Sequence, residues 1–109
     1  EERKIIMIHF NKETFEKALA EGKLMMVDFW AEWCGPCQML GPVIESLANR
    51  YEGRAVVGKI NTDEEQALAM SFQITGIPTV IFFKDGKEID RLEGVMPPDA
   101  FIQVLEKNL

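Results

Sequence analysis

The chain has 109 residues, of which 47% are hydrophobic and 28% charged, as is usual for a globular protein. Its net charge of -6 and sequence pI of about 4.8 argue against a nucleic-acid-binding protein. No apolar run reaches the roughly 20 residues that a membrane-spanning helix needs. The length predicts a single domain over residues 1–109, with one core that needs no structural metal or disulfide.

Strands and helices are predicted to alternate in the first half of the chain. A short strand is expected at residues 5–9, and a helix from about Asn11, whose side chain is a good N-cap. Residues 24–30 would form a strand that is apolar on both faces, which is typical of the centre of a covered sheet. A second helix is predicted after the two cysteines, because residues 40, 43, 44 and 47 are apolar at helical spacing, and Gly53 should end it.

The second half predicts a strand at residues 55–60 and a short helix to about Ser71, opened by the capping-box pattern of residues 62–65. Two strands, at residues 79–83 and 88–92, should pair through a hairpin at Asp85 and Gly86. A last helix is expected from about Pro98. This order predicts a three-layer α/β arrangement with a mixed central sheet. We expect Met25, Met26, Met39 and Met70 to fill the core.

The two cysteines, Cys34 and Cys37, are separated by Gly35 and Pro36. A disulfide between them would close a very short loop and would stabilise the fold little. A structural zinc site takes four ligands, and His9 is the only histidine, so we expect no metal. A zinc site shared between two chains stays open, but it would need a special assembly.

A third interpretation is a pair of reactive thiols. Cys34 follows a predicted central strand and lies at the start of a helix, where unpaired amides and the helix dipole favour a thiolate. Cys37 lies one turn later and could resolve a mixed disulfide formed by Cys34. Two inert buried cysteines are the alternative, but a CxxC at a strand-to-helix junction favours redox chemistry.

The cysteines lie within residues 27–37, VDFWAEWCGPC, which closely resemble the active-site segment of the thioredoxin family. Residues 76–79, GIPT, resemble the cis-proline loop of that family, and residues 83–86, FKDG, its hairpin. Lys59 and Gly94 match as well, and the resemblance covers almost the whole chain. It implies a thioredoxin fold, α/β/α, with four or five strands and four flanking helices.

The resemblance also implies a thiol–disulfide oxidoreductase that reduces protein disulfides. Cys34 would attack a target disulfide and Cys37 would resolve the mixed disulfide, with no bound cofactor. An external NADPH-dependent flavoprotein, thioredoxin reductase, would reduce the pair again. The partners would then be that reductase and disulfide-containing proteins, with no nucleic acid, no membrane and no second copy of the chain.

The use of cysteine favours a cytoplasmic location. The first ten residues lack the long apolar segment of a signal peptide. The chain begins with Glu1 rather than Met, however, so a removed targeting segment stays open.

Asp28 interrupts an apolar strand, where burial should raise the pKa of its carboxyl. The resemblance implies that this acid exchanges a proton with Cys37 and pairs with Lys59, so that both belong to the catalytic group. The alternatives are an acid at a solvated strand end and an ordinary strand-surface lysine.

The resemblance further implies a substrate-binding surface and a cis peptide bond between Ile77 and Pro78. We expect Trp33 to be exposed beside the thiols and Trp30 to pack in the core. The residues expected to bind substrate are Trp33, Gly35, Pro36, Gly76, Ile77, Pro78 and Gly94.

Three departures from the family pattern are visible. Gln38 replaces a basic residue, Glu93 replaces a small apolar residue, and residues 96–98 replace a polar helix cap. The first two should shift substrate preference toward basic or neutral partners, so replacing Glu93 with valine should raise turnover of acidic targets. An oxidant or isomerase of the same fold, and a binding module with incidental cysteines, remain alternative functions.

Overall fold

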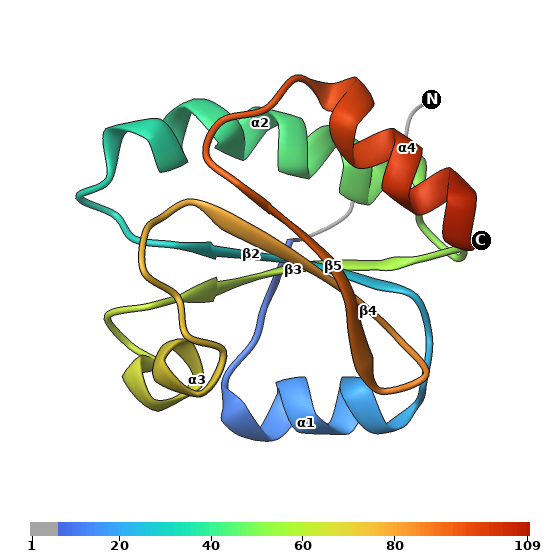
Figure 1. Ribbon diagram of the computed structural model, residues 1–109, viewed down its shortest axis with the longest axis horizontal. Coiled ribbons are helices and arrows are strands. Elements are labelled where there is room, and N and C mark those ends of the chain that lie inside the picture. Colours follow the sequence, from blue (N-terminus) through green and yellow to red (C-terminus); the bar gives the residue numbers. More distant parts are fainter. Residues whose placement is uncertain (1–6) are drawn as a thin grey trace.

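A mixed sheet of five strands lies between two layers of helices in the computed structural model, which describes residues 7–109 (Figure 1). The strands are β1 Ile8–His9, β2 Met25–Trp30, β3 Val56–Asn61, β4 Thr79–Lys84 and β5 Lys87–Glu93. The helices are α1 Lys12–Ala20, α2 Gly35–Arg50, α3 Gln66–Ser71 and α4 Pro98–Asn108. The predicted thioredoxin fold, with four helices around a mixed sheet, is confirmed.

The sheet has the strand order β1-β3-β2-β4-β5, so β2 lies at its centre. β1 and β2 both run parallel to β3, whereas β4 runs antiparallel to β2 and to β5. All but the last residue of β2 is buried, as predicted for a strand covered on both faces. The central strand therefore delivers its carboxyl end, and the cysteines that follow, to one edge of the molecule.

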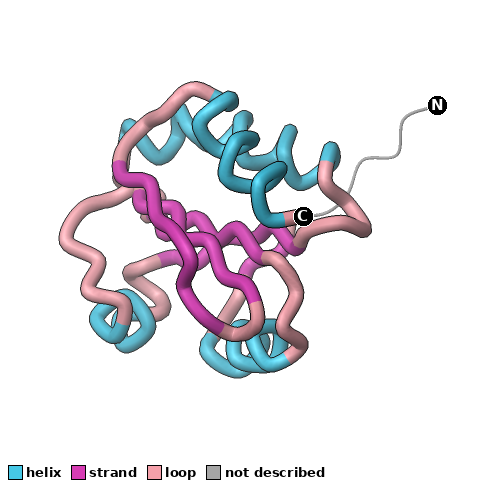
Figure 2. The backbone as a smooth tube through the Cα atoms, turned by 45° about the vertical axis from the view of Figure 1, so that its right-hand side comes forward, coloured by secondary structure: helices cyan, strands magenta, loops and turns pink. Residues whose placement is uncertain are grey.

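Each face of the sheet has its own apolar layer. α2 and α4 cover one face through Leu40, Ile44 and Phe101, which pack with Met26 and Phe82 of the sheet. α1 and α3 cover the other face, and Figure 2 shows the two helical layers on opposite sides of the strands. On this second face, rings of Phe15, Phe72 and Phe83 meet edge to face with centroids 5.4–5.7 Å apart.

Several predicted boundaries are confirmed. The side chain of Asn11 accepts a hydrogen bond from the Thr14 N–H and caps α1, as expected. Asp85 and Gly86 both have positive φ angles, 55° and 77°, which suits a two-residue hairpin between β4 and β5. The predicted strand at residues 5–9 is observed at Ile8–His9, and its first two residues lie outside the described part of the chain.

The predicted capping box at residues 62–65 is wrong. α3 begins only at Gln66, and within the described chain its N-cap, Glu65, makes no side-chain capping bond. The turn before it is held by Asn61, whose Oδ1 accepts hydrogen bonds from the N–H groups of Asp63 and Glu64 at 2.9 and 3.2 Å. The Thr62 hydroxyl donates to the Trp30 carbonyl instead of capping a helix.

The methionine prediction is half right. Met25 and Met26 are fully buried in β2, whereas Met39 and Met70 are 70% and 77% exposed. Met39 and Met70 lie on the outer faces of α2 and α3, where the apolar stripe of each helix does not reach.

Over residues 7–109, no helix has both the length and the apolar character needed to cross a membrane.

Candidate active site

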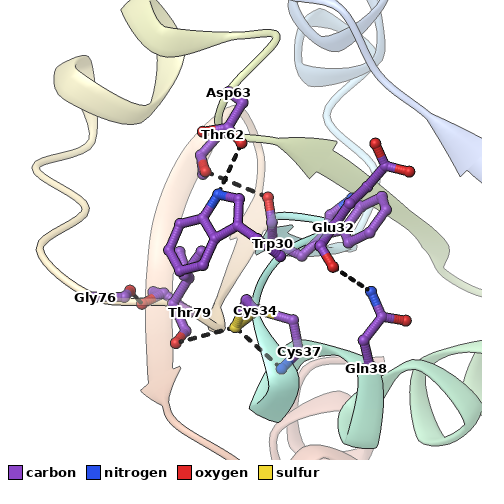
Figure 3. The surroundings of a disulfide bond; sticks show 11 residues. Trp30, Glu32, Cys34, Cys37, Gln38, Thr62, Asp63, Gly76 and Thr79 are labelled. Atoms are coloured by element: carbon purple, nitrogen blue, oxygen red, sulfur yellow. Dashed lines mark hydrogen bonds between the residues drawn. A yellow bond between two sulfur atoms is a disulfide. The ribbon is translucent and has the colours of Figure 1, made fainter.

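The two cysteines lie where β2 ends and α2 begins. Cys34 is the N-cap of α2, and Cys34 and Cys37 form a disulfide with their Cα atoms 5.2 Å apart. The Cys37 N–H donates to Cys34 Sγ at 3.2 Å (Figure 3). Pro36 lies in the first turn, where a missing N–H costs nothing. The first turn of α2 carries no acidic side chain, so nothing there opposes a thiolate on Cys34.

Cys34 is the cysteine that meets the surface. Although Cys34 is only 4% exposed, it lines a groove of about 480 Å³, whereas Cys37 is 1% exposed and does not line it. Cys34 Sγ also lies 3.8 Å from the carbonyl oxygen of Ile77. A substrate in the groove would therefore reach Cys34 before Cys37. The groove is lined by Trp33, Cys34, Gly35, Pro36, Thr62, Ala69, Ile74, Thr75, Gly76 and Ile77.

Five of the seven residues predicted to bind substrate line this groove, and Pro78 and Gly94 do not. Pro78 is buried and follows a cis peptide bond, as the resemblance implied. The Gly94 N–H donates to the Pro78 carbonyl at 2.8 Å, and Gly94 adopts a φ of 86°, so a glycine suits this position. This hydrogen bond joins the residue after β5 to the cis-proline loop, whose Gly76 and Ile77 line the groove.

Four groove residues were not predicted. Thr62 follows β3, Ala69 lies in α3, and Ile74 and Thr75 precede the cis-proline loop. Small and apolar side chains of this kind carry no chemical pattern. For Thr62, Ile74 and Thr75, the available signal was their position in loops at the end of the sheet where Cys34 lies, since such loops often build a site.

Asp28 lies in β2 with 0% of its surface exposed. Neither carboxylate oxygen has a hydrogen-bond partner within residues 7–109. Burial raises the pKa of this carboxyl from 3.8 to about 7, against a smaller opposing effect of the Lys59 charge. The prediction of a buried acid with a raised pKa is confirmed, and the alternative of a solvated strand end is excluded.

Lys59 does not form the direct pair with Asp28 that the resemblance implied. The two residues are Cα partners across β2 and β3, yet no ion pair joins them in the described chain. The Lys59 ammonium instead lies 4.1 Å from the ring centroid of Trp30. Burial of Asp28 adds a cost to direct pairing, since an ammonium loses hydration if it enters that position. Lys59 still acts on Asp28 through space.

Trp33, Gln38 and Glu93 were each singled out in the sequence, and only Trp33 lines the groove. Trp33 is 71% exposed, as predicted, and its indole N–H donates to Asp63 at 2.8 Å. The Gln38 amide donates to the Glu32 carbonyl at 3.1 Å and so fastens the loop before Cys34 to α2 (Figure 3). Glu93 is exposed at the end of β5, opposite Thr79.

The comparisons with known proteins agree with this geometry. The family model described as Thioredoxin matches residues 6–107, nearly the whole chain. The chain belongs to the thioredoxin family. Like other members of this family, it is a thiol–disulfide oxidoreductase that works by thiol–disulfide exchange at a redox-active cysteine pair. In the described part of the chain, no group of three or more His, Cys, Asp or Glu side chains is placed to hold a metal ion.

Individual thioredoxins are similar along most of their length. A thioredoxin of Staphylococcus haemolyticus is 40% identical over 103 residues, which cover 94% of this chain and 98% of the relative. A thioredoxin of Chlorobaculum thiosulfatiphilum is 44% identical over 91 residues, or 84% of each chain. The solved structure of a mutant thioredoxin from Halobacterium salinarum superposes with a TM-score of 0.83 at 37% identity, covering 92% of this chain and 88% of that one.

Proposed function

We propose that the chain is a general protein-disulfide reductase in which Cys34 is the nucleophile and Cys37 the resolving thiol. The observation that carries this assignment is the groove, which Cys34 lines and Cys37 does not. The Cys37 N–H beside Cys34 Sγ and the start of α2 would stabilise a thiolate on Cys34. Residues 1–109 would act as one functional unit.

The reaction would proceed in two exchanges. The Cys34 thiolate attacks one sulfur of a target disulfide, which forms a mixed disulfide and releases the other target sulfur as a thiolate. Cys37 then loses its proton and attacks Cys34 Sγ, which forms the Cys34–Cys37 disulfide and releases the second target sulfur. Two electrons pass from the protein to the target, which leaves as a dithiol after taking up two protons.

Asp28 is proposed as the group that accepts the Cys37 proton. Its carboxyl pKa of about 7 matches a proton acceptor that works near neutral pH. Lys59 would tune this acid through its charge. The carboxyl can return the proton when the disulfide is reduced again.

The groove would bind an extended segment of the target. Trp33 and Ile77 offer apolar surface on either side of Cys34, and Gly35 and Gly76 let a peptide backbone approach closely. The backbone of the loop before Pro78 would pair with the segment as a strand does. An NADPH-dependent thioredoxin reductase would reduce the Cys34–Cys37 disulfide again. We infer that the protein acts in the cytoplasm, as a monomer and without a bound cofactor.

A redox titration of the Cys34–Cys37 pair, combined with an insulin-reduction assay, tests this function. We expect the reduction potential of the Cys34–Cys37 pair to lie in the range of protein-disulfide reductants, below that of oxidants and disulfide isomerases. We also expect the protein to reduce insulin catalytically. Cys34→Ser should abolish turnover. A strongly oxidising potential without reductase activity would favour an oxidant. A Cys34→Ser variant that keeps its partner and its role in the complex would favour a binding module.

A further inference from the structure

We propose that Trp30 is a positioning residue, whose indole ring holds the Lys59 ammonium and keeps this cation from pairing with the Asp28 carboxylate. The inference rests on the proposed function, because it concerns the group that accepts the Cys37 proton. It assigns to Trp30 a role other than the core packing expected from the sequence.

The strand register places two side chains, Asp28 and Trp30, within reach of Lys59. Asp28 and Trp30 are two residues apart in β2, so their side chains lie on the same face of the sheet. Lys59 is the Cα partner of Asp28 on β3, and its side chain is on that face too. A lysine side chain at this position can reach either the carboxylate or the indole.

In the structure, the Lys59 ammonium lies over the indole ring of Trp30. Lys59 Nζ lies 4.1 Å from the Trp30 ring centroid, within the range of a cation–π contact. Both Asp28 oxygens are left without a hydrogen-bond partner among the described residues. Trp30 and Lys59 are each half-buried, so the ammonium keeps part of its hydration over the ring and would lose more of it beside the fully buried Asp28.

The other groups that face Asp28 do not compete for this role. On β4 its Cα partner is Val80, which is apolar, and α2 contributes the cysteines at its first turn. On β1 the nearest titratable group is His9, whose ring centroid lies 6.3 Å from that of Trp30. Within residues 7–109, Lys59 is the charged group that opposes the effect of burial on the Asp28 pKa.

The consequence is chemical. A direct Lys59–Asp28 ion pair would favour the carboxylate and make it a weaker base toward the Cys37 thiol. Trp30 prevents this pairing, so Asp28 remains able to accept and return a proton near neutral pH. The indole, which also packs against the cluster of Ala31, Cys34 and Cys37, therefore acts on this proton transfer through Lys59.

The test is a carboxyl-carbon NMR titration of Asp28 in four proteins: the original chain, Trp30→Leu, Lys59→Met and the double variant. We expect Trp30→Leu to lower the Asp28 midpoint by about one pH unit, because the released ammonium can then pair with the carboxylate. Removing the indole also admits water, which lowers the midpoint by itself. The Lys59→Met background measures that hydration effect alone, and the fall there should be clearly smaller.

Two results would overturn the proposal. One is an unchanged Asp28 midpoint in Trp30→Leu, and the other is an equal fall with and without Lys59. His9 is followed through its own ring resonances, so its titration is distinguished from that of Asp28. Trp30→Phe, which keeps an aromatic face, should leave the midpoint close to that of the original chain.

A measurement on the unsubstituted protein covers the case in which Trp30→Leu fails to fold. The ε-methylene protons of Lys59 should be shifted upfield by the Trp30 ring current, and they should stay shifted while Asp28 ionises. Loss of the upfield shift on ionisation would mean that the ammonium moves to the carboxylate, which contradicts the proposal.

The failure of the proposed function would look different. If Asp28 does not accept the Cys37 proton, Asp28→Asn leaves the pH dependence of insulin reduction unchanged, whereas the Trp30 and Lys59 titrations still behave as described. If only the positioning role fails, Asp28→Asn alters the pH profile and the four-protein comparison shows no dependence on Lys59.

Discussion

Asp28 lowers the stability of the folded protein when its carboxyl is ionised. It is a carboxylic acid without a hydrogen-bond partner in the described chain, at the centre of an otherwise apolar strand. Its raised pKa means that the folded protein resists ionisation of this group more than the unfolded chain does. The unfolding free energy therefore falls as pH rises from about 4 to about 7, and the full cost is present above that range.

Asp28→Asn should remove this pH dependence. A rise in pKa from 3.8 to about 7 corresponds to about 4 kcal/mol, so the stability of the variant relative to the original chain should increase by about that amount from pH 4 to pH 9. Denaturant unfolding of the oxidised proteins at several pH values measures the difference. Asp85→Asn, in the exposed turn between β4 and β5, provides a control. Its stability relative to the original chain should change by less than about 0.5 kcal/mol from pH 4 to pH 9. A flat difference for Asp28→Asn would contradict the raised pKa.

Three exposed acidic side chains neighbour residues of the groove or of the cis-proline loop. Glu32 precedes Trp33, Asp63 accepts the Trp33 N–H, and Glu93 ends β5 next to the cis-proline loop, all with exposed side chains. Gln38 adds no positive charge to balance them. This distribution should slow the approach of acidic targets and favour basic ones.

Glu93→Gln should therefore raise kcat/KM for an acidic disulfide peptide by about two- to five-fold at low salt and lower it for a basic peptide of equal length. The effect should shrink at high salt, because exposed charges are then screened. Glu21→Gln is the matched control, since Glu21 lies before β2, at the opposite end of that strand from the cysteines. Equal changes for acidic and basic peptides would show that Glu93 does not select by charge.

At the level of elements, β1 reaches the sheet only because position 58 of β3 has no side chain. A Cβ on Gly58 would lie 2.5 Å from Cε2 of Phe10 and 3.1 Å from the carbonyl oxygen of Ile8. Phe10 is buried and its N–H donates to the Lys59 carbonyl, so neither the ring nor the strand can move away freely.

Gly58→Ala should reduce the unfolding free energy by about 2 kcal/mol, because a methyl group would overfill this contact. Gly41→Ala gives the opposite expectation. Gly41 lies inside α2 with no atom within 4 Å of a built Cβ, so alanine should stabilise the helix by about 0.5–1 kcal/mol. Denaturant unfolding compares the two, and a Gly58→Ala variant as stable as the original chain would contradict the steric argument.

The elements also mark where sequence reasoning succeeds and where it fails. Long apolar patterns, as in β2 and α2, predicted the correct element and its burial. The prediction failed in the short segment before α3, because Asn61 closes a local turn there and the Thr62 hydroxyl bonds to Trp30 of the neighbouring strand. The turn that closed on Asn61 could not be separated from a capping box by residue type alone.

On the scale of the whole molecule, segments far apart in the sequence build one site. The end of β2, the start of α2 and the loop before β4 meet at one edge of the sheet, with the exit of β5 beside them. The cysteines and Asp28 were predictable because their chemistry stands out against an apolar background. Ile74 and Thr75 were not, because only the folded loop brings them to the groove. The position of Lys59 over Trp30 likewise depends on a choice between two neighbours that the sequence does not decide.

The central claim is that Cys34 attacks the target and Cys37 resolves the intermediate. Mass spectrometry of reduced Cys37→Ser and Cys34→Ser variants, each mixed with a disulfide peptide, tests it most directly. The account predicts that Cys37→Ser accumulates a mixed disulfide on Cys34, whereas Cys34→Ser, whose remaining thiol lies outside the groove, forms one far more slowly. Equal rates of adduct formation through the two cysteines would contradict it.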